Sequence, residues 1–287
     1  MTVPLDRQNP SAGTIDVHYA LVPHTDTSRP SAGTIVPNPG GPGQATIASA
    51  GLYLQVLAPL LRERDLLLID ARGTGQSGAL TCPSLSSHDP LSLSQQSVWT
   101  ICGADLGARA GLYGSAAVAD DIDAVRASLG RDKLDLWGDS YGTFLMPVYA
   151  ARYPEHVRSV VLDGAFPIAS DRWGRDVLGG VRRVIGLVCR RTQRCSGRQV
   201  LTRIGRLARR LRRQPVGFTA HSPLGPVRLR LSERELADVT YGGGDPRVYG
   251  LLPAAVDAAL DHDLAPLERL VTVSRINEVG GFLIDPT

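Results

Sequence analysis

The residues best suited to covalent chemistry are those of Gly138-Asp139-Ser140-Tyr141-Gly142, a G-x-S-x-G pattern. A short apolar-rich run typical of a buried strand, Leu134–Trp137, comes before it, and a segment with a helical pattern follows. A serine between a strand and a helix lies in a sharp turn, which exposes its hydroxyl and leaves the next N–H at a helix N-terminus. We predict that Ser140 is a nucleophile and that the Tyr141 N–H helps to form an oxyanion hole. An ordinary glycine-rich turn is the alternative.

A second glycine-rich stretch, Asn38–Gly43 with the sequence NPGGPG, follows the strand-like residues Thr34–Val36. Because glycine has no Cβ, backbone N–H groups in such a stretch can approach a ligand closely. We expect the Gly41 N–H to supply the other half of the oxyanion hole. The predicted chemistry is acyl transfer, in which the serine attacks a carbonyl, a histidine takes its proton, and water hydrolyses the acyl-enzyme. A plain turn is again the alternative.

The elements that must position these residues alternate between strands and helices. Apolar runs typical of strands lie at 15–22, 34–36, 65–69, 134–137 and 157–162, and helical patterns lie at 52–61, 115–129 and 141–152. Alternation at this spacing predicts an α/β fold with a doubly wound, mainly parallel sheet. In the loop that follows residue 69, we expect Asp70 and Arg72 to hold the loop rather than to do chemistry.

The part of the chain after Gly164 has a different residue pattern, which no longer alternates between strands and helices. It contains an arginine-rich helical stretch at 171–213, a hairpin-like excursion at 223–231, a capping box of Ser232 and Glu235 before a helix at 233–240, and an amphipathic helix at 251–260. The last residues indicate no clear terminal element. We therefore predict a core at 1–165 and a mostly helical lid at 166–287, with the C-terminal strands of the core absent.

Composition limits the possible partners. The chain has 287 residues, of which 43% are hydrophobic, and a formal net charge of +3. No run of about 18 apolar residues occurs, so no membrane span is predicted, and the small net charge does not indicate nucleic acid. The arginines between 203 and 213 could form a nucleic-acid or membrane surface, but a solvated face of a lid helix is the simpler interpretation. No signal-peptide pattern is present at the start of this chain.

The four cysteines fall as two pairs that are close in sequence, Cys82 and Cys102, then Cys189 and Cys195. The chain has no C-x-x-C motif and no histidine at ligand spacing from these cysteines, so we expect no metal site. Local pairs fit two disulfides, which indicate an oxidising compartment. Four buried thiols are the alternative.

Six motifs together point to a known family. They are VPLD at 3–6, NPGGPG at 38–43, DARGTGQS at 70–77, the aspartate-rich 120–123, GDSYGT at 138–143, and the stretch 153–164. The chain resembles the α/β-hydrolase fold and, within it, the proline-iminopeptidase-like serine aminopeptidases, especially the secreted tripeptidyl aminopeptidases of actinobacteria. The resemblance implies the pairings Cys82–Cys102 and Cys189–Cys195, a secreted or cell-envelope location, no cofactor, and a peptide substrate with a free N-terminus.

The acid and the base are harder to place. In this fold the order along the chain is serine, acid, histidine, and members of the family carry the last two on late strands of the sheet. Here 147 residues follow Ser140, and the lid takes up most of them. Asp163 is the best candidate acid and His262 the candidate base, although the position of His262 at the end of a lid helix favours a structural role. His156 is expected to be structural, and His221 lies in the lid excursion.

The predicted function is that of a serine hydrolase that cleaves short N-terminal peptides through an acyl-enzyme on Ser140. We expect the activity of this chain alone to be impaired, because it lacks a well-placed base. A sheet without its last strands would also leave an open apolar edge. A carboxylesterase or lipase shares the same serine turn and is one alternative. A non-catalytic fragment or binding protein that keeps the fold but not the triad is the other.

Overall fold

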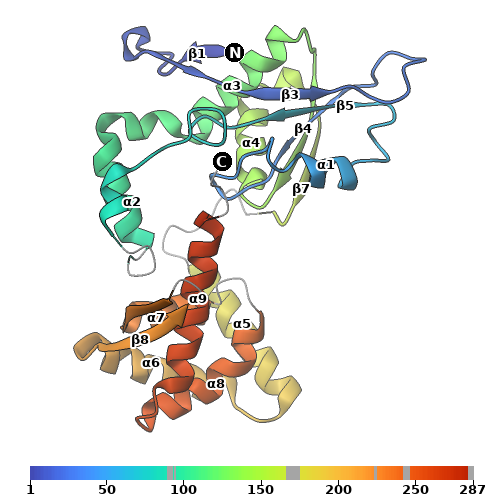
Figure 1. Cartoon of the computed structure of the whole chain (residues 1–287). Coiled ribbons are helices and arrows are strands. Elements are labelled where there is room, and N and C mark those ends of the chain that lie inside the picture. Colours follow the sequence, from blue (N-terminus) through green and yellow to red (C-terminus); the bar gives the residue numbers. More distant parts are fainter. Residues whose placement is uncertain (89–92, 94, 166–174, 223–224, 242–245, 284–287) are drawn as a thin grey trace. The chain divides into compact units, whose positions relative to one another are not determined.

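The structure is a computed structural model, and it describes residues 1–287 except 89–92, 94, 166–174, 223–224, 242–245 and 284–287. The chain divides into two compact units (Figure 1). Unit 1 comprises Met1–Cys82 and Cys102–Ala169, and unit 2 comprises Pro83–Ile101 and Ser170–Thr287. The sequence placed 83–101 in the core, whereas the structure groups it with unit 2. The chain leaves and re-enters unit 1 at Cys82 and Cys102, which are joined by a disulfide as predicted.

A five-stranded sheet forms the centre of unit 1, in the order β3-β5-β4-β6-β7. The strands are β3 (Tyr19–Val22), β4 (Thr34–Asn38), β5 (Asp65–Ile69), β6 (Leu134–Asp139) and β7 (Val157–Asp163). Only β3 is antiparallel to its neighbour, so the predicted mainly parallel sheet is confirmed. The run 15–22, expected to be one strand, is two: β2 (Thr14–Asp16) pairs with β1 (Thr2–Pro4), and β3 pairs with β5.

Helices cover both faces of this sheet. Side chains alternate between the two faces of a strand, so successive residues of β5 pack against helices on opposite faces. Leu66 and Leu68 of β5 pack in one cluster with Tyr53 of α1 (Ala50–Val56). Leu67 and Ile69 pack in another cluster, which contains buried residues of α3 (Ser115–Ser128) and α4 (Gly142–Arg152). The helix predicted at 52–61 is shorter than expected and ends at Val56, since Pro59 disfavours a helical residue before it.

Two polar side chains hold the loop after β5, as the sequence predicts. The Asp70 carboxylate accepts hydrogen bonds from the Ile47 N–H at 2.8 Å and the Gln76 N–H at 3.0 Å. Arg72 is buried and donates to both carboxylate oxygens of Asp121, at 2.6 and 2.7 Å. It also donates to the Leu5 carbonyl at 2.7 Å, so one guanidinium ties the N-terminal segment to α3.

The outer strand β7 leaves apolar surface uncovered in the described part of the chain. Val160, Val161 and Leu162 are 40%, 44% and 37% exposed. β7 is the last strand of the sheet on this side, and β6 is its neighbour. The sequence predicts an open apolar edge of the sheet, and this interpretation stays a prediction.

Short helices connect the main elements of unit 1 and the 83–101 excursion. They are η1 (Pro10–Ala12), η2 (Pro83–Ser87), α2 (Gln95–Leu106), η3 (Gly107–Tyr113) and η4 (Pro154–His156). The sequence shows no periodicity between the first two cysteines, so α2 was missed.

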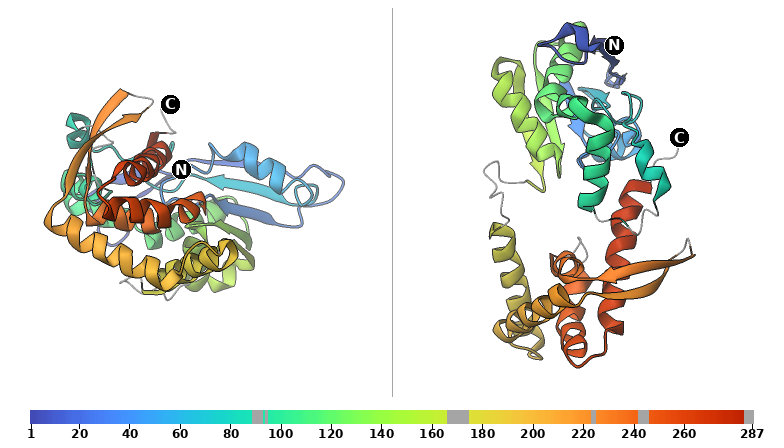
Figure 2. Two further views of the ribbon diagram at one scale, coloured as in Figure 1. Left: turned by 90° about the horizontal axis from the view of Figure 1, so that it is seen from below. Right: turned by 90° about the vertical axis from the view of Figure 1, so that its left-hand side faces the viewer.

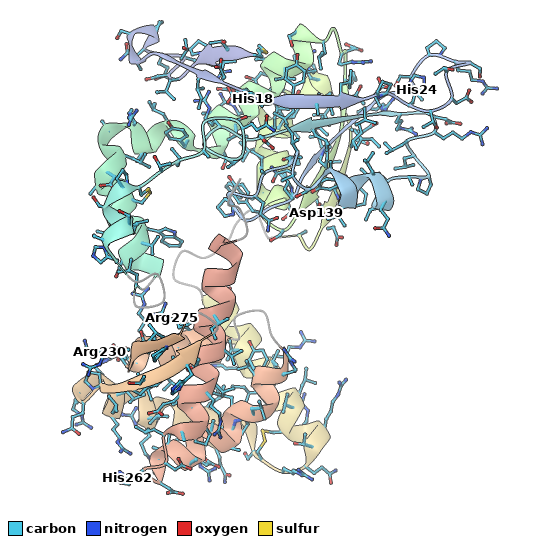
Figure 3. The ribbon with its side chains drawn as sticks, in the orientation of Figure 1. His18, His24, Asp139, Arg230, His262 and Arg275 are labelled. Carbon is cyan, nitrogen blue, oxygen red and sulfur yellow. A yellow bond between two sulfur atoms is a disulfide. The ribbon has the colours of Figure 1, made fainter. Side chains whose placement is uncertain are left out.

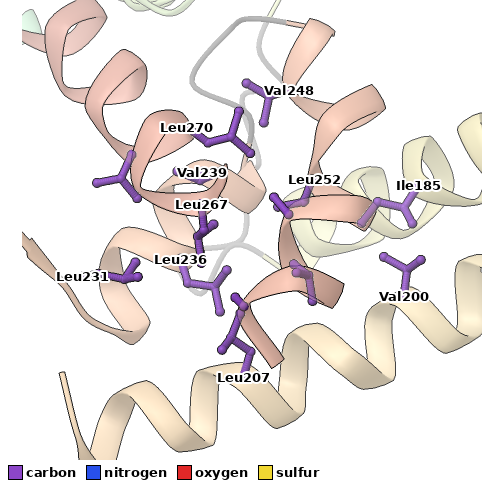
Figure 4. Close-up of a cluster of buried hydrophobic side chains, with 14 of the residues drawn as sticks. Ile185, Val200, Leu207, Leu231, Leu236, Val239, Val248, Leu252, Leu267 and Leu270 are labelled. Atoms are coloured by element: carbon purple, nitrogen blue, oxygen red, sulfur yellow. The ribbon is translucent and has the colours of Figure 1, made fainter. Parts of the chain in front are cut away.

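Unit 2 is built from helices and one hairpin (Figures 1 and 2). Its elements are α5 (Arg175–Thr192), α6 (Gly197–Arg213), β8 (Val216–Ser222), β9 (Gly225–Leu231), α7 (Glu233–Tyr241), α8 (Pro246–Leu260) and α9 (Ala265–Leu283). The main apolar cluster, shown in Figure 4, takes side chains from all five of these helices, such as Ile185, Leu207, Leu236, Leu252 and Leu267. The second predicted disulfide, Cys189–Cys195, closes the turn between α5 and α6.

The sequence predicts no clear element for the last residues, 280–287. Of these, 284–287 lie outside the described residues, but 280–283 belong to α9, which spans Ala265–Leu283. Its β-branched and glycine residues have low helix propensity, but Leu267, Leu270 and Val271 are buried in the core of unit 2, and packing outweighs propensity. The capping box was predicted correctly, because the Ser232 N–H donates to Glu235 Oε2 at 2.8 Å. None of the described helices is both long enough and apolar enough to cross a membrane.

Candidate active site

Ser140 lies in the turn between β6 and α4, where the sequence places it. Its φ angle is 49°, and its side chain is exposed. A non-glycine residue in this left-handed region costs about 1–2 kcal/mol. Such a strained turn is typical of a serine nucleophile that stands at the end of a sheet.

The glycines on either side of Ser140 are required by close backbone contacts. A Cβ on Gly138 would lie 2.4 Å from the Gly142 carbonyl oxygen, and a Cβ on Gly142 would lie 2.5 Å from the Asn38 carbonyl oxygen. Both distances are shorter than real Cβ contacts, so a side chain at either position would push α4 away from β6 or β4. The sequence pattern therefore has a steric cause in this structure.

The glycine-rich stretch after β4 lies against the Ser140 turn. β4 and β6 are adjacent parallel strands, in register with Asn38 opposite Gly138, so both loops emerge at the same edge of the sheet. A Cβ on Gly40, which has a φ of 93°, would lie 2.9 Å from the Ser140 Cβ and 3.1 Å from the Tyr141 nitrogen. The peptide bond between Gly41 and the proline after it is cis.

The two N–H groups that we predict to bind the oxyanion are not hydrogen-bonded within the part of the chain that the structure describes. The Gly40 N–H is already taken by Asn38 Oδ1 at 3.2 Å. The N–H groups of Gly41 and Tyr141 have no acceptor among the described residues. The side chain of Tyr141 is fixed as well, because its hydroxyl hydrogen-bonds to Ser115 Oγ at 2.7 Å. Ser115 is the first residue of α3, after Gly114 at the N-cap position.

Asp139 is a residue of the site that sequence reasoning missed (Figure 3). Its Oδ1 accepts a hydrogen bond from Trp137 Nε1 at 2.9 Å, and its Oδ2 accepts one from the Tyr53 hydroxyl at 2.8 Å. Burial and the nearby Asp139 carboxylate raise the pKa of Tyr53. Tyr53 is on α1, which follows the glycine-rich stretch, so the bond links the two loops that carry the Gly41 and Tyr141 N–H groups. No local signal marks a pair this far apart in sequence.

The candidate acid, Asp163, ends β7 beside the serine. It is opposite Asp139 in the sheet, and its carbonyl accepts the Ser140 N–H at 3.0 Å. Its side chain is exposed. Asp163 is therefore a neighbour of Ser140, and its role as the acid stays a prediction.

The structure brings no histidine of unit 1 to the serine. His156 hydrogen-bonds to Asp123 Oδ1 at 2.7 Å, at the opposite end of β6 and β7 from Ser140. His24 Nδ1 hydrogen-bonds to Asp65 Oδ1 at 2.7 Å, which raises the pKa of the imidazole. His18 lies at the same edge as Ser140 but three strands away, about 14 Å at the usual strand spacing. Among the described side chains, none hydrogen-bonds to Ser140 Oγ.

His262, the candidate base, lies in unit 2 between α8 and α9. Its φ is 72°, and its N–H donates to the Ala259 carbonyl at 3.3 Å, so it ends α8 in a left-handed cap. Arg210 Nη2 donates to its Nδ1 at 2.9 Å. These contacts account for a histidine at this position without any catalytic role. Within the described residues, no three His, Cys, Asp or Glu side chains gather as metal ligands do.

Comparisons with known proteins define the class. The family model described as alpha/beta hydrolase fold matches residues 33–214, so the chain belongs to the α/β hydrolase fold family. The serine protease Hip1 of Mycobacterium tuberculosis is 34% identical over 184 residues, which are 58% of this chain and 35% of that protein. The tripeptidyl aminopeptidase of Streptomyces coelicolor is 28% identical over 191 residues, 60% of this chain and 35% of that protein. The matched part thus spans about a third of the length of these relatives.

Solved structures are less similar. The proline iminopeptidase of Mycobacterium smegmatis is 20% identical, with a TM-score of 0.40 over 87% of this chain and 69% of that chain. A superposition of this quality does not define a function. The family and the serine peptidase relatives agree with the resemblance that the sequence motifs indicate.

Proposed function

We propose that this chain carries the nucleophile and oxyanion hole of a serine hydrolase that cleaves short peptides from the N-terminus of a substrate. The observation that supports it most directly is the Ser140 turn, with a φ of 49°, beside the unbonded N–H groups of Gly41 and Tyr141. Ser140 Oγ would attack the peptide carbonyl, and the two N–H groups would stabilise the oxyanion. The acyl-enzyme would then be hydrolysed.

A base must accept the proton of the Ser140 hydroxyl, and the described residues place no base beside it. No described side chain bonds to Ser140 Oγ, and the Nδ1 atom of His262 is engaged with Arg210. Loss of the base histidine in serine proteases lowers kcat on the order of 10⁶-fold. We therefore expect the isolated chain to be close to inactive and to react slowly with fluorophosphonates.

The substrate and the location follow from the relatives. Proteins named tripeptidyl aminopeptidase and serine protease match 60% and 58% of this chain, so we propose a peptide with a free N-terminus as substrate. Disulfides are stable in oxidising compartments. The two disulfides of the chain therefore support secretion or a place in the cell envelope.

A carboxylesterase is the second candidate, because a protein named Carboxylesterase B from Mycobacterium tuberculosis is 32% identical over 185 residues. It would use the same serine and the same oxyanion hole. Turnover of aminoacyl anilides against fatty-acid esters separates the two functions. We expect the anilides to be the better substrates.

The test of the proposed function is fluorophosphonate labelling and anilide turnover by the 287-residue chain beside its Ser140→Ala variant. We expect slow labelling of the chain and none of the variant. Fast turnover that depends on Ser140 would reveal a base within the chain, and His262→Ala and His221→Ala would identify it. Equal labelling of both proteins would show that Ser140 is not the nucleophile and would support a binding protein with this fold.

A further inference from the structure

The two units carry opposite net charge. Unit 1 has 11 basic and 15 acidic residues, a formal charge of −4, and unit 2 has 20 basic and 13 acidic residues, a formal charge of +7. The segment from Arg175 to Arg213 alone holds 13 arginines and a single acidic residue, Asp176. Ordinary solvated faces mix both signs of charge. A face of one sign therefore indicates a partner of the opposite sign.

The amphipathic pattern of α5 and α6 turns these arginines away from the core. The apolar faces of the two helices, with Ile185, Leu207 and Leu211, are buried in unit 2. Three arginines make contacts within unit 2: Arg203 pairs with Asp257, Arg212 with Glu233, and Arg210 donates to the Ala259 carbonyl and His262.

We call the other nine arginines between Arg182 and Arg213 the arginine surface. They are Arg182, Arg183, Arg190, Arg191, Arg194, Arg198, Arg206, Arg209 and Arg213. All nine are exposed, and among the described residues none pairs with an acidic group. Guanidinium groups without partners keep all their donors available for an anion.

The arginine surface is concave at the α5–α6 turn. A hollow of about 470 Å³ is lined there by Arg182, Arg190 and Arg198, next to the Cys189–Cys195 disulfide. The turn is tight, because a Cβ on Gly197 would lie 3.0 Å from the Gly186 Cα. Arginine forks match the oxygens of a phosphate group well, so three of them around one hollow favour a phosphate as ligand.

Five acidic side chains of unit 1 are engaged within that unit, since Asp65, Asp120, Asp121, Asp123 and Asp135 each pair with a basic side chain there. The turn that carries the hollow is closed by a disulfide, and disulfides persist in oxidising compartments rather than in the cytosol. This favours an envelope surface over intracellular nucleic acid.

We propose that the arginine surface docks unit 2 on a membrane surface rich in anionic phospholipid, with a lipid phosphate in the hollow. Because the apolar faces of α5 and α6 are buried in the core, the contact is electrostatic and involves no insertion of either helix. This role is independent of hydrolysis at Ser140.

Sedimentation with vesicles tests the proposal on the disulfide-bonded chain. We expect binding to vesicles of phosphatidylglycerol mixed with phosphatidylcholine, no binding to phosphatidylcholine alone, and release at high salt. The variant Arg182→Gln/Arg190→Gln/Arg198→Gln should bind about a hundredfold more weakly, roughly fivefold for each arginine. The matched control Arg228→Gln/Arg230→Gln/Arg269→Gln removes the same charge from exposed positions elsewhere in unit 2 and should keep most of the binding. Circular dichroism of both variants checks that they fold.

Four outcomes would overturn the proposal. Equal losses in the two triple variants would mean that only net charge matters, and equal binding to both kinds of vesicle would remove the role of anionic lipid. Binding of inorganic phosphate in solution without binding to the phosphatidylglycerol vesicles would indicate a site for a small anion. Tighter binding to a DNA duplex than to the anionic vesicles, at the same salt concentration, would indicate nucleic acid.

Discussion

In unit 1 five carboxylates pair with basic side chains of the same unit, whereas in unit 2 nine of the arginines between Arg182 and Arg213 are exposed and have no acidic partner among the described residues. The pair Arg72–Asp121 is buried in unit 1, and Asp70 and Asp139 each accept hydrogen bonds through both carboxylate oxygens. The core of unit 2 is mainly one apolar cluster. Two buried polar side chains of this unit contact each other: Glu235, which caps α7, accepts from Arg275 of α9, and Arg275 also donates to the Leu93 carbonyl (Figure 3).

The two units differ in where their polar side chains lie and in what those side chains do. In unit 1 the buried polar groups fix loops at the edge of the sheet where Ser140 stands, and a catalytic site needs positions that are fixed to a fraction of an ångström. In unit 2 the apolar core supplies the stability and leaves the helix surfaces free to meet a partner. The two units should therefore respond differently to the same kinds of change.

Removal of a buried charge partner should produce the largest effect. Arg72→Ala leaves Asp121 buried with only Arg7 beside it, and we expect a loss of about 3–5 kcal/mol in the free energy of unfolding of unit 1. Arg7→Ala is the matched control, because Arg7 contacts the same carboxylate at 2.8 Å from a partly exposed position, and should cost about 1 kcal/mol or less. Urea unfolding measures both, and equal losses would contradict the comparison.

The disulfides should differ in their contributions. In the chain-entropy model, closing the 20-residue separation between Cys82 and Cys102 stabilises by about 3 kcal/mol, and closing the 6-residue separation between Cys189 and Cys195 stabilises by about 2 kcal/mol. Paired Cys→Ser variants and urea unfolding measure both values. Non-reducing peptide mapping checks the pairings, and four alkylatable thiols in the oxidised protein would refute them.

Acid should destabilise unit 1 before unit 2. Burial alone would raise the pKa of Asp65, Asp123 and Asp135, but hydrogen bonds from His24, Arg126 and Arg158 outweigh it and lower each pKa below its ordinary value of 3.8. A carboxylate whose pKa is lowered by folding stabilises the fold fully above the unfolded pKa and loses that contribution as the pH falls through the folded pKa.

The free energy of unfolding of unit 1 should therefore fall below about pH 4. Unit 2, with its apolar core, should change less. Hydrogen exchange of β6 and α8 amides against pH distinguishes the units, and earlier loss of protection in α8 would reverse the comparison.

The smallest effect concerns the hydrogen bond that links the two loops of the candidate active site. Tyr53→Phe removes the hydroxyl that donates to Asp139 and should cost about 1–2 kcal/mol, because a partly buried carboxylate oxygen loses its donor. Tyr241→Phe, at an exposed position of unit 2, should change the stability by about 0.5 kcal/mol or less. Thermal unfolding compares the two variants, and a neutral Tyr53→Phe would show that the bond does not hold the loops together.

Much of the fold and part of the site could be read from the sequence, because their signals are local. The strands at 65–69 and 134–139, the turn at Ser140 and the capping box of α7 each depend on residues within a few positions of one another. Apolar periodicity favours a helix or a strand, a capping residue fixes where a helix begins, and glycines beside a serine permit a sharp turn. Each of these patterns restricts the local backbone conformation. The cysteine pairs are also close in sequence.

The remaining features depend on which distant segments meet, and only the tertiary structure decided them. Tyr53 and Asp139 are 86 positions apart, and Arg72 and Asp121 are 49 apart, so no local pattern marks either pair. Residues 83–101 join unit 2, and α9 forms despite a weak helical pattern because its apolar side chains find a core to fill. By itself the sequence determined the serine turn, the sheet and the helices with strong local signals. The pairing of polar groups across the fold was left to long-range packing, since burial and a partner are properties of the whole chain and not of a short segment.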